Sequence, residues 1–344
     1  MQRTYKIKTA FLVNFVEKKM KILWKDPNSC SAMIKNKNFF LTESNDKYEI
    51  KNKIPRFVDK KNYTDAFGMQ WNYFRKTQLD SYSKFPLSEQ RLKRCLGDNL
   101  FSTLKGKLVL EAGCGAGRFT EILLDNGANV TSIDMSDAVE ANQKNFPQDE
   151  NHIIAQADIC KLPFMKEQFD IVICLGVIQH TQYPEQSLKA LCNQVKPGGW
   201  IIVDHYVFSW SYSTQIAKIL SRFVLKRIRP EKAFLITGYL VKVFLPLHRI
   251  GRRSKIWQAL MRRVTPVVSY YNDFPELSDE LQKEWALLDT HDNLTDCYKH
   301  LTTKKKFKQS IHNLGLQGVK CWSAGIGVEG RGMKPIDISN IINV

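Results

Sequence analysis

The residues best placed for chemistry form a glycine-rich run, with Gly113, Gly115 and Gly117 directly after an apolar segment at residues 108–111. That segment does not alternate with polar residues, which predicts a strand covered on both faces. Glycines at such a turn let a ligand approach the backbone amides without a Cβ in the way. A helix is expected to begin near Arg118, and the amides at its start offer donors and partial positive charge. Because position six of the run is Arg118 and not glycine, the dinucleotide fingerprint is not met.

Two carboxylates follow the next two predicted strands. Asp134 comes after residues 129–133, where a carboxylate can accept hydrogen bonds from both hydroxyls of a ribose. Asp134 is also a candidate helix N-cap, since a helix is expected to start just beyond it, and one carboxylate can serve in both roles. Asp158 comes after residues 152–156 and can accept a hydrogen bond from an adenine amine, with Ile159 lying against the ring. A nucleoside ligand is therefore expected beside the glycine run.

The elements that must position these residues alternate between strand and helix patterns. This alternation runs through residues 105–206 and resumes at 303–344 with one helix and two strands, which predicts βαβ units. The expected fold is a doubly wound α/β structure with a seven-stranded, mostly parallel sheet. Ligands of such sheets bind at the carboxyl ends of the strands. The chain divides into an N-terminal extension, a helical lead-in, the core, a basic helical cap insert and the segments that complete the core: residues 1–61, 62–104, 105–206, 207–302 and 303–344.

Composition narrows the class of protein. The eight cysteines form no C-x-x-C pair and several lie in apolar runs, which predicts reduced core thiols in a cytoplasmic protein and no metal site. The apolar patch at residues 10–16 is not followed by a small-residue cleavage site, so no secretory signal is expected. The apolar run at 233–247 is interrupted by Lys242 and is expected to be too short to span a bilayer.

Together these motifs resemble one family. The run at 111–117, Asp134, residues 157–158, residues 169–172 and the Lys-Pro-Gly-Gly run at 196–199 resemble the class I S-adenosylmethionine-dependent methyltransferases, in particular their ubiquinone/menaquinone-biosynthesis-like branch. The resemblance implies a Rossmann-like fold, S-adenosylmethionine as cofactor and methyltransferase activity.

The resemblance also implies roles for single residues. The three glycines of the run would wrap the methionine portion of the cofactor, and the backbone of Leu175 would bind its amine. Asp134 would hold the ribose, and Asp158 with Ile159 would hold the adenine. The full set of implied cofactor contacts is Glu111, Gly113, Gly115, Gly117, Asp134, Met135, Asp158, Ile159 and Leu175.

A second resemblance concerns the N-terminal extension. Residues 54–58, 67–71 and 75–80 resemble bacterial methyltransferases that carry a small zinc-ribbon-like module in front of the core. The paired cysteines of that module are missing, and Cys30 is the single candidate that remains. Four zinc ligands cannot be found, so the module is expected to be degenerate.

A base is needed only if the acceptor loses a proton on attack. His180 follows the fourth strand and is the first candidate; His205, beside Tyr206 after the fifth strand, is the second. The alternative for His180 is packing over the cofactor or bonding to the backbone. His291 and Asp292 are expected in a loop before the final helix, where they line the acceptor pocket or simply lie at the surface.

The net charge of +17 gathers in the insert, where residues 218–263 hold thirteen Lys and Arg and a single acid, Glu231. Two interpretations of residues 216–263 are open: contact with a membrane or a lipid-linked anionic acceptor, or a cap whose basic face is merely solvated. Nucleic acid is not expected as a partner, because Leu175–Ile178 cannot form a stacking platform for a flipped base. The expected function is methyl transfer to a small-molecule or lipid-linked acceptor. A non-catalytic scaffold that binds the cofactor is the alternative, and an RNA methyltransferase comes after it.

Overall fold

The computed structural model describes residues 22–59, 62–325 and 327–336. Its centre is a seven-stranded sheet with the strand order β10-β11-β9-β8-β5-β6-β7. The strands β5, β6, β7, β8 and β9 pair in parallel, while β11 runs antiparallel to both β9 and β10. The predicted doubly wound, mostly parallel sheet is confirmed. Its strands are β5 (Leu108–Ala112), β6 (Asn129–Asp134), β7 (His152–Gln156), β8 (Phe169–Cys174), β9 (Val195–Tyr206), β10 (Gln317–Ala324) and β11 (Gly327–Met333).

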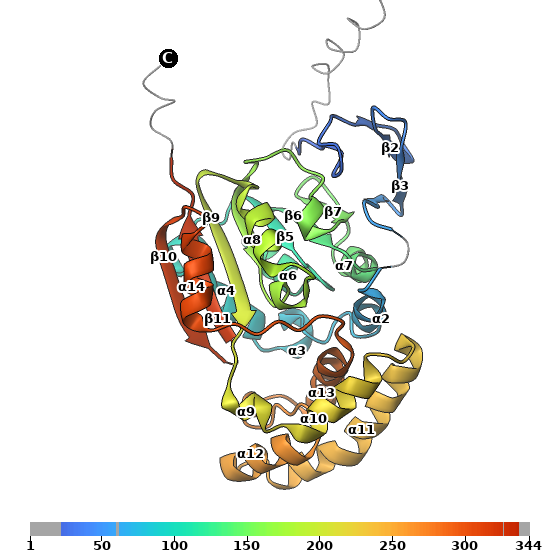
Figure 1. Ribbon diagram of the computed structural model, residues 1–344, viewed down its shortest axis with the longest axis vertical. Coiled ribbons are helices and arrows are strands. Elements are labelled where there is room, and N and C mark those ends of the chain that lie inside the picture. Colours follow the sequence, from blue (N-terminus) through green and yellow to red (C-terminus); the bar gives the residue numbers. More distant parts are fainter. Residues whose placement is uncertain (1–21, 60–61, 326, 337–344) are drawn as a thin grey trace, which may run out of the picture.

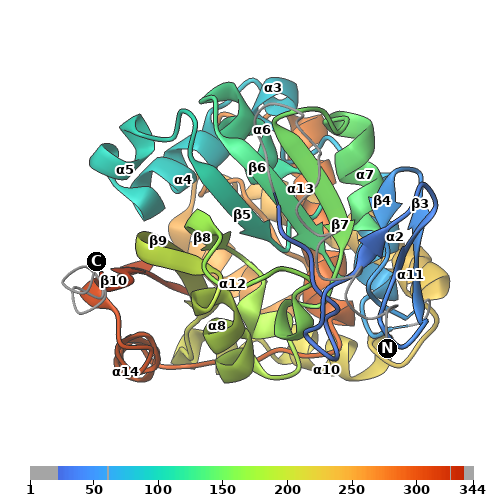
Figure 2. The ribbon, with the colours of Figure 1, turned by 90° about the horizontal axis from the view of Figure 1, so that it is seen from above.

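Helices cover both faces of this sheet (Figure 2). One face packs against α4 (Leu87–Leu96) and α6 (Arg118–Asp125), through residues such as Leu92 and Leu123. The other packs against α8 (Pro184–Cys192) and α14 (Lys304–His312), through Leu188 and Phe307 among others. Two covered faces explain why strand β5 has a continuous apolar sequence. The remaining core elements are α3 (Asp80–Ser83), α5 (Asp98–Ser102), α7 (Ala138–Asn145), η2 (Ile159–Lys161) and η3 (Ile178–His180).

A small antiparallel sheet precedes the core. Its strands are β1 (Ile34–Lys35), β2 (Phe39–Leu41), β3 (Lys47–Lys51) and β4 (Ile54–Pro55), and the aromatic rings of Trp24, Phe40 and Phe57 pack beneath it. It docks beside the edge strand β7, where the Phe57 amide donates to the Gln156 carbonyl at 2.8 Å. Within the part of the chain that is described, no cluster of three or more His, Cys, Asp or Glu side chains could hold a metal ion. The ribbon-like character of this segment stays a prediction.

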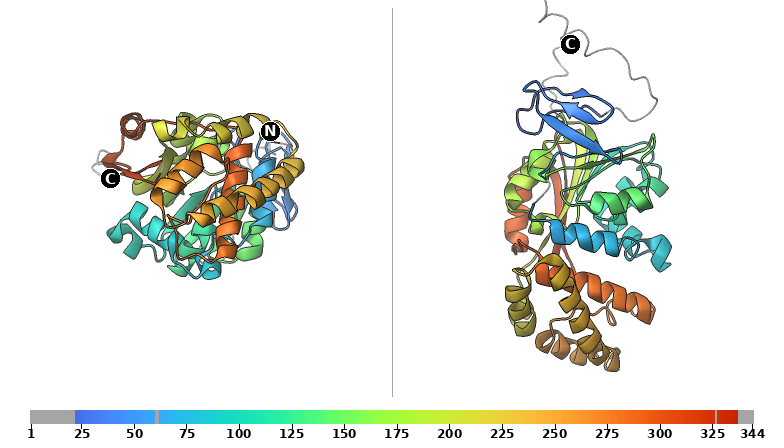
Figure 3. Two further views of the ribbon diagram at one scale, coloured as in Figure 1. Left: turned by 90° about the horizontal axis from the view of Figure 1, so that it is seen from below. Right: turned by 90° about the vertical axis from the view of Figure 1, so that its right-hand side faces the viewer.

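The insert forms a helical cap at the opposite end of the molecule from this small sheet (Figure 1 and Figure 3). The chain leaves the core after β9 and returns to the same point, because residues Tyr206, Phe208 and Thr302 exchange backbone hydrogen bonds of 2.9 and 3.0 Å. The cap helices are α9 (Trp210–Ser213), α10 (Ile216–Leu225), α11 (Pro230–Ile250), α12 (Lys255–Val264) and α13 (Asp279–Thr295). Helix α13 lies between the outer cap helices and the core, and it also contacts α2 (Asp65–Tyr73).

Helix α11 corrects one expectation from the sequence. Its 21 residues make it, by length and apolar composition, the one helix among the described residues that could cross a membrane. The expectation that its apolar run is too short was wrong, because the helix continues past that run at both ends. Helices in soluble cores can pass the same test, so the length alone does not decide between the two environments. The apolar patch at residues 10–16 lies outside the described residues.

Candidate functional site

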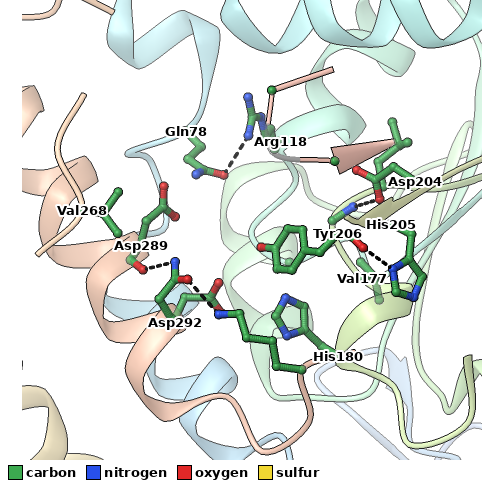
Figure 4. Close-up of a pocket in the computed structure, with 18 of the residues that line it drawn as sticks. Gln78, Arg118, Val177, His180, Asp204, His205, Tyr206, Val268, Asp289 and Asp292 are labelled. Atoms are coloured by element: carbon green, nitrogen blue, oxygen red, sulfur yellow. Dashed lines mark hydrogen bonds between the residues drawn. The ribbon is translucent and has the colours of Figure 1, made fainter. Parts of the chain in front are cut away.

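A cavity of about 980 Å³ lies where the carboxyl ends of the parallel strands face the cap (Figure 4). The loops after β5, β6, β7 and β8 and the end of β9 form one wall, and α2, α13 and the cap helices form the other. This is the edge at which open α/β sheets bind their ligands. The volume is at the upper end of the ~300–1,000 Å³ typical of small-molecule sites. It is large enough for a cofactor and an acceptor together.

The glycine loop fits its surroundings only because it lacks side chains at two positions. Gly113 has a φ of +78°, and a Cβ there would lie 2.2 Å from the side chain of Val177. Gly115 has a φ of +53°, and a Cβ there would lie 3.2 Å from the ring of Trp71. The loop is thus held between the segment after β8 and helix α2, with its backbone at the cavity. A side chain at either position would displace these walls.

The two predicted carboxylates border this cavity beside the loop. Asp134 accepts a hydrogen bond from the Gly115 amide at 3.0 Å on one oxygen, and bonds of 2.8 and 2.7 Å from the amide and hydroxyl of Ser136 on the other. Burial raises the pKa of Asp134. Helix α7 begins at Ala138 and its N-cap residue is Asp137, so the N-cap interpretation of Asp134 was wrong. Asp158 accepts a bond from the amide of Cys160 at 2.8 Å and lines the cavity.

Most of the predicted cofactor residues line the cavity, and two do not. Those that do are Gly113, Gly115, Asp134, Met135, Asp158, Ile159 and Leu175. Glu111 lies behind the loop, where it is 2% exposed and accepts hydrogen bonds from Thr120 at 2.5 Å and Ser132 at 3.0 Å. Gly117 faces away from the cavity, since a Cβ there would lie 2.7 Å from the ring of Phe146. Both residues join the loop to neighbouring elements, and their predicted contacts with the cofactor stay predictions.

Comparisons with known proteins bear on the same segment. Residues 110–203 match the family model described as a methyltransferase domain. Over 99 residues the chain is 37% identical to a ubiquinone biosynthesis O-methyltransferase of Coxiella burnetii, which covers 28% of this chain and 42% of that protein. It is 33% identical over 132 residues to the enzyme of the same name from Pseudomonas fluorescens, covering 35% of this chain and 56% of that protein. The chain thus spans about half the length of these curated relatives.

The chain contains a class I S-adenosylmethionine-dependent methyltransferase domain. Solved structures similar to this chain include magnesium protoporphyrin IX methyltransferase from Synechocystis, at 13% identity and a TM-score of 0.42, covering 79% of this chain and 96% of that one. Human N-acetylserotonin methyltransferase aligns at 14% identity and a TM-score of 0.37, covering 80% of this chain and 62% of that one. The fold assignment rests on the strand order itself.

The cofactor of this domain is S-adenosylmethionine, and the residues present fit it. Gly113 and Gly115 leave the backbone without side chains at the cavity, as a close-lying ligand requires. Asp134 and Asp158 offer acceptor oxygens, which hydroxyl and amine groups need. Met135 and Ile159 add apolar surface beside these carboxylates.

His180 lines the cavity from η3 and is held through one ring nitrogen. Its Nδ1 lies 3.2 Å from the carbonyl of Tyr298 and 3.2 Å from Oδ2 of Asp296. Burial alone would lower the pKa of His180, but Asp296 and the nearby charge of Asp292 outweigh it, and the pKa is raised. Nε2 has no hydrogen-bond partner among the described residues. The base-like nitrogen is therefore left available to a ligand.

His205 borders the cavity in a different setting. Its Nδ1 lies 3.0 Å from the Tyr206 carbonyl, and its ring packs 6.0 Å from that of Phe307 in α14. Burial lowers its pKa, in contrast to His180. The ring of Tyr206 lies 5.4 Å from that of His180 and so helps to position the first candidate.

Helix α13 replaces the loop expected around His291 and Asp292. His291 is fully buried, 3.5 Å from the hydroxyl of Thr237, and burial lowers its pKa to about 4. Asp292 lines the cavity, and burial raises its pKa. The expectation failed because Thr, His, Asp and Asn are weak helix formers, whereas packing against α11 stabilises the helix here.

The acceptor side of the cavity holds charged residues that the sequence did not single out. Arg118 is partly buried against the rings of Phe119 and Trp285, donates to the Ser88 hydroxyl at 2.9 Å, and has no acidic partner within ion-pair distance among the described residues. Burial lowers its pKa to about 10. Its position directly after the glycine loop was visible in the sequence, but the burial depends on α13 and could not be read there.

Two further groups complete this side. Asp289 of α13 accepts a hydrogen bond from the Tyr270 hydroxyl, and burial raises its pKa to about 7. Lys218 of α10 is 8% exposed, lines the cavity and has no hydrogen-bond or ion-pair partner among the described residues. Burial, and then the charges of Lys299 and Arg262, lower its pKa to about 8. The acceptor end thus combines a carboxylate on α13 with an unpaired cation from the cap.

Proposed function

We propose that this protein transfers a methyl group from S-adenosylmethionine to a hydroxyl oxygen of a small or lipid-linked acceptor. The observation that carries the proposal is that Asp134 and Asp158 border one cavity beside the glycine loop. The O-methyltransferases among the relatives support oxygen as the methylated atom, although they match this chain over the domain alone.

The division of the cavity supports two bound molecules. The strand-end residues form a cofactor side, while α13 and the cap form an acceptor side with Lys218, Asp289 and Asp292. His180 lies on the segment after β8 and faces Tyr206 at the end of β9. It is therefore positioned between the two sides, where an acceptor hydroxyl would meet the methyl group.

When bound, S-adenosylmethionine would supply a methyl group on a positively charged sulfur, and in-line attack by an acceptor oxygen on that methyl carbon would release the sulfur as the neutral thioether of S-adenosylhomocysteine. The residues of this chain hold the two molecules in that alignment and exclude water, which is the main contribution to such a reaction. His180 accepts the hydroxyl proton on Nε2, while Nδ1 bonds to the Tyr298 carbonyl and faces Asp296. The carboxylate of Asp296 stabilises the imidazolium that forms.

Titration calorimetry of the whole chain with S-adenosylmethionine tests the cofactor site. The wild type is expected to bind, and Asp134→Asn is expected to weaken binding on the order of 10- to 100-fold, the cost of a lost hydrogen bond to a charged group. Asp98→Asn is the matched control, because the side chain of Asp98 is 87% exposed and does not line the cavity. Absence of binding by the wild type would overturn the proposal.

Methyl transfer itself needs a separate measurement. Incubation with methyl-labelled S-adenosylmethionine and fractionated cell extract is expected to label a small or lipid-soluble product and to release S-adenosylhomocysteine. Binding without label in any fraction would favour the non-catalytic scaffold. Label confined to RNA would favour the RNA methyltransferase, and either result contradicts the proposed acceptor class.

A further inference from the structure

Helix α10 is amphipathic, but most of its apolar residues face outward, whereas those of a surface helix in a soluble protein face the core. Its apolar residues recur every three to four positions on the outward side, and three of them, Ile216, Leu220 and Phe223, are 63%, 63% and 62% exposed. Its inward side carries one buried apolar residue, Leu225, at its C-terminal end, together with two cations, Lys218 in the cavity wall and Arg222 on the buried carboxylate of Asp296. A surface helix normally buries its apolar stripe. The reversal implies that the outward stripe meets an apolar phase.

Helices α11 and α12 repeat the outward stripe. In α11, Leu235 is 73% and Ile250 is 77% exposed, although the inward stripe of that helix packs on α13. In α12, Ile256 is 85% exposed. We call the joint surface the cap surface. It consists of Ile216, Ile219, Leu220, Phe223, Val224, Leu235, Ile236, Tyr239, Val243, Leu247, Ile250, Ile256, Leu260 and Val264.

The cap surface is large and lies at one end of the molecule. Its fourteen residues are most of the large apolar side chains that are exposed anywhere in the described chain. Viewed from below, the cap helices lie in front of the core (Figure 3). Scattered apolar side chains need no explanation, but this many on three neighbouring helices, with α12 in contact with both α10 and α11, indicate an interaction site.

Basic residues surround the apolar ones. The described ion pairs of residues 218–263 involve only Arg222, Arg249 and Arg262, so most of the thirteen cations are left for an external partner. Arg252 and Arg253, between α11 and α12, and Lys255, the first residue of α12, are exposed and have no ion-pair partner among the described residues. Apolar side chains at acyl-chain depth with cations at headgroup depth are the pattern of a protein that binds anionic membranes.

We propose that the cap surface docks flat on a lipid bilayer that contains anionic headgroups. A second copy of this chain is a poorer occupant, because a symmetric contact would place the same unpaired cations against each other. Spanning is also disfavoured. The inward side of α11 buries His248, whose ring nitrogens lie 2.9 Å from Gln258 and 2.9 Å from Thr265, and insertion would break these contacts.

Docking also brings the cavity to the membrane. Lys218 of α10 and Arg262 and Arg263 of α12 line the cavity, and both helices carry the cap surface on their other side. An amphiphilic acceptor could then pass from the bilayer to the cavity with its anionic group near these cations. This consequence rests on the proposed function, whereas the docking itself does not.

Flotation of the full-length chain with vesicles tests the docking. The wild type is expected to float with phosphatidylcholine vesicles that contain phosphatidylglycerol, and to stay largely unbound with phosphatidylcholine alone. Arg252→Gln/Arg253→Gln/Lys255→Gln is expected to lower the partition coefficient on the order of 100-fold, from the loss of three interfacial cations. Lys305→Gln/Lys306→Gln/Lys308→Gln removes the same charge from exposed positions of α14 and is expected to bind as the wild type does.

A second pair of variants tests the apolar contribution without disturbing the core. Phe223→Ser/Leu235→Ser/Ile256→Ser changes one exposed residue on each of α10, α11 and α12 and is expected to lower partitioning at least on the order of 10-fold. Ile34→Ser/Met165→Ser/Tyr183→Ser changes three exposed apolar residues elsewhere and is expected to leave it unchanged.

Three results would overturn the proposal. One is a wild type that does not float with anionic vesicles. Another is sedimentation showing a dimer that the cap variant abolishes, with no flotation, since the surface would then bind a second copy. The third is a vesicle-bound protein that alkaline extraction does not release, because a spanning α11 would replace flat docking. Failure of methyl transfer alone would leave the docking intact, so the two proposals are distinguished.

Discussion

Lys218 should make the folded protein less stable than it would be with an apolar residue at that position. The side chain is 8% exposed and has no acidic partner among the described residues. Its ammonium group loses hydration on folding and gains no opposing charge in return. Lys218→Met keeps the length of the side chain and removes the charge. We therefore expect the variant to be more stable than the wild type at neutral pH.

The size of the effect follows from the pKa. Folding lowers the pKa of Lys218 from 10.5 to about 8, a difference worth about 3 kcal/mol at ~1.4 kcal/mol per pKa unit. Below about pH 8 the amine is protonated in both states, and the full cost is present. Between about 8 and 10.5 the unfolded state binds more protons, so the stability of the wild type rises with pH. The gain from Lys218→Met is expected to be about 1–3 kcal/mol at pH 7 and to shrink by roughly 2 kcal/mol at about pH 9.5.

Urea unfolding of both proteins at the two pH values measures this gap directly, because groups common to both cancel in the difference. Lys242→Met is the matched control, since Lys242 is exposed on α11 and its replacement is expected to change stability by less than about 0.5 kcal/mol at either pH. The reasoning is refuted if Lys218→Met is destabilised at pH 7. It is also refuted if its advantage does not depend on pH.

Three further outcomes are expected. His180→Gln should retain S-adenosylmethionine binding but lower kcat on the order of 10²- to 10⁴-fold. It should also abolish the rise of kcat with pH, and the midpoint of that rise in the wild type should lie above pH 6.5. The control variant His205→Gln should keep the rise. Glu111→Gln should lose less stability than the wild type as the pH rises from 4.5 to about 7, as measured by urea unfolding. In the wild type the pKa of this carboxyl is raised to about 7, so in this range the folded state holds a proton that the unfolded state has lost. Equal pH profiles of the two proteins would contradict this. Gly117→Ala should lower the free energy of unfolding by about 1–3 kcal/mol, because φ is +99° and the added methyl group meets Phe146. The control Gly106→Ala, with φ +75° but no neighbour within 4 Å, should lower it less.

Local patterns in the sequence were enough for the core and for much of the cofactor side. The continuous apolar run of β5, the glycines after it and the carboxylate at the end of β6 are close in sequence, and the fold adds only their parallel pairing. Local patterns did not show the surroundings that a distant element provides. Gly117 faces Phe146 at the end of α7, and Glu111 faces Thr120 of α6, so neither lines the cavity. The packing of Arg118 against Trp285 of α13 depends on a helix more than 150 residues away in the sequence.

The cap shows the same limit more sharply, because its periodicity was visible but its direction was not. Apolar residues at helical spacing give the same sequence pattern whether their side of the helix faces the core or faces outward. What fixes the direction of α10 is Arg222, whose Nε donates to Asp296 at 2.8 Å, and Asp296 belongs to the end of α13. This partner lies 74 residues further along the chain.

That carboxylate also joins the cap to the candidate base. Asp296 is 1% exposed, and its carboxylate forms ion pairs with Arg222 of α10, with Lys299 at 3.4 Å and with His180 at 3.2 Å. Burial would raise the pKa of Asp296, but these cations outweigh it, and the pKa is lowered. Removing the carboxylate would leave buried cations unpaired, which costs more than the loss of one ion pair. A change at Asp296 therefore acts on the anchorage of α10 and on His180 at once, and only substitution of His180 itself separates proton transfer from the position of the cap.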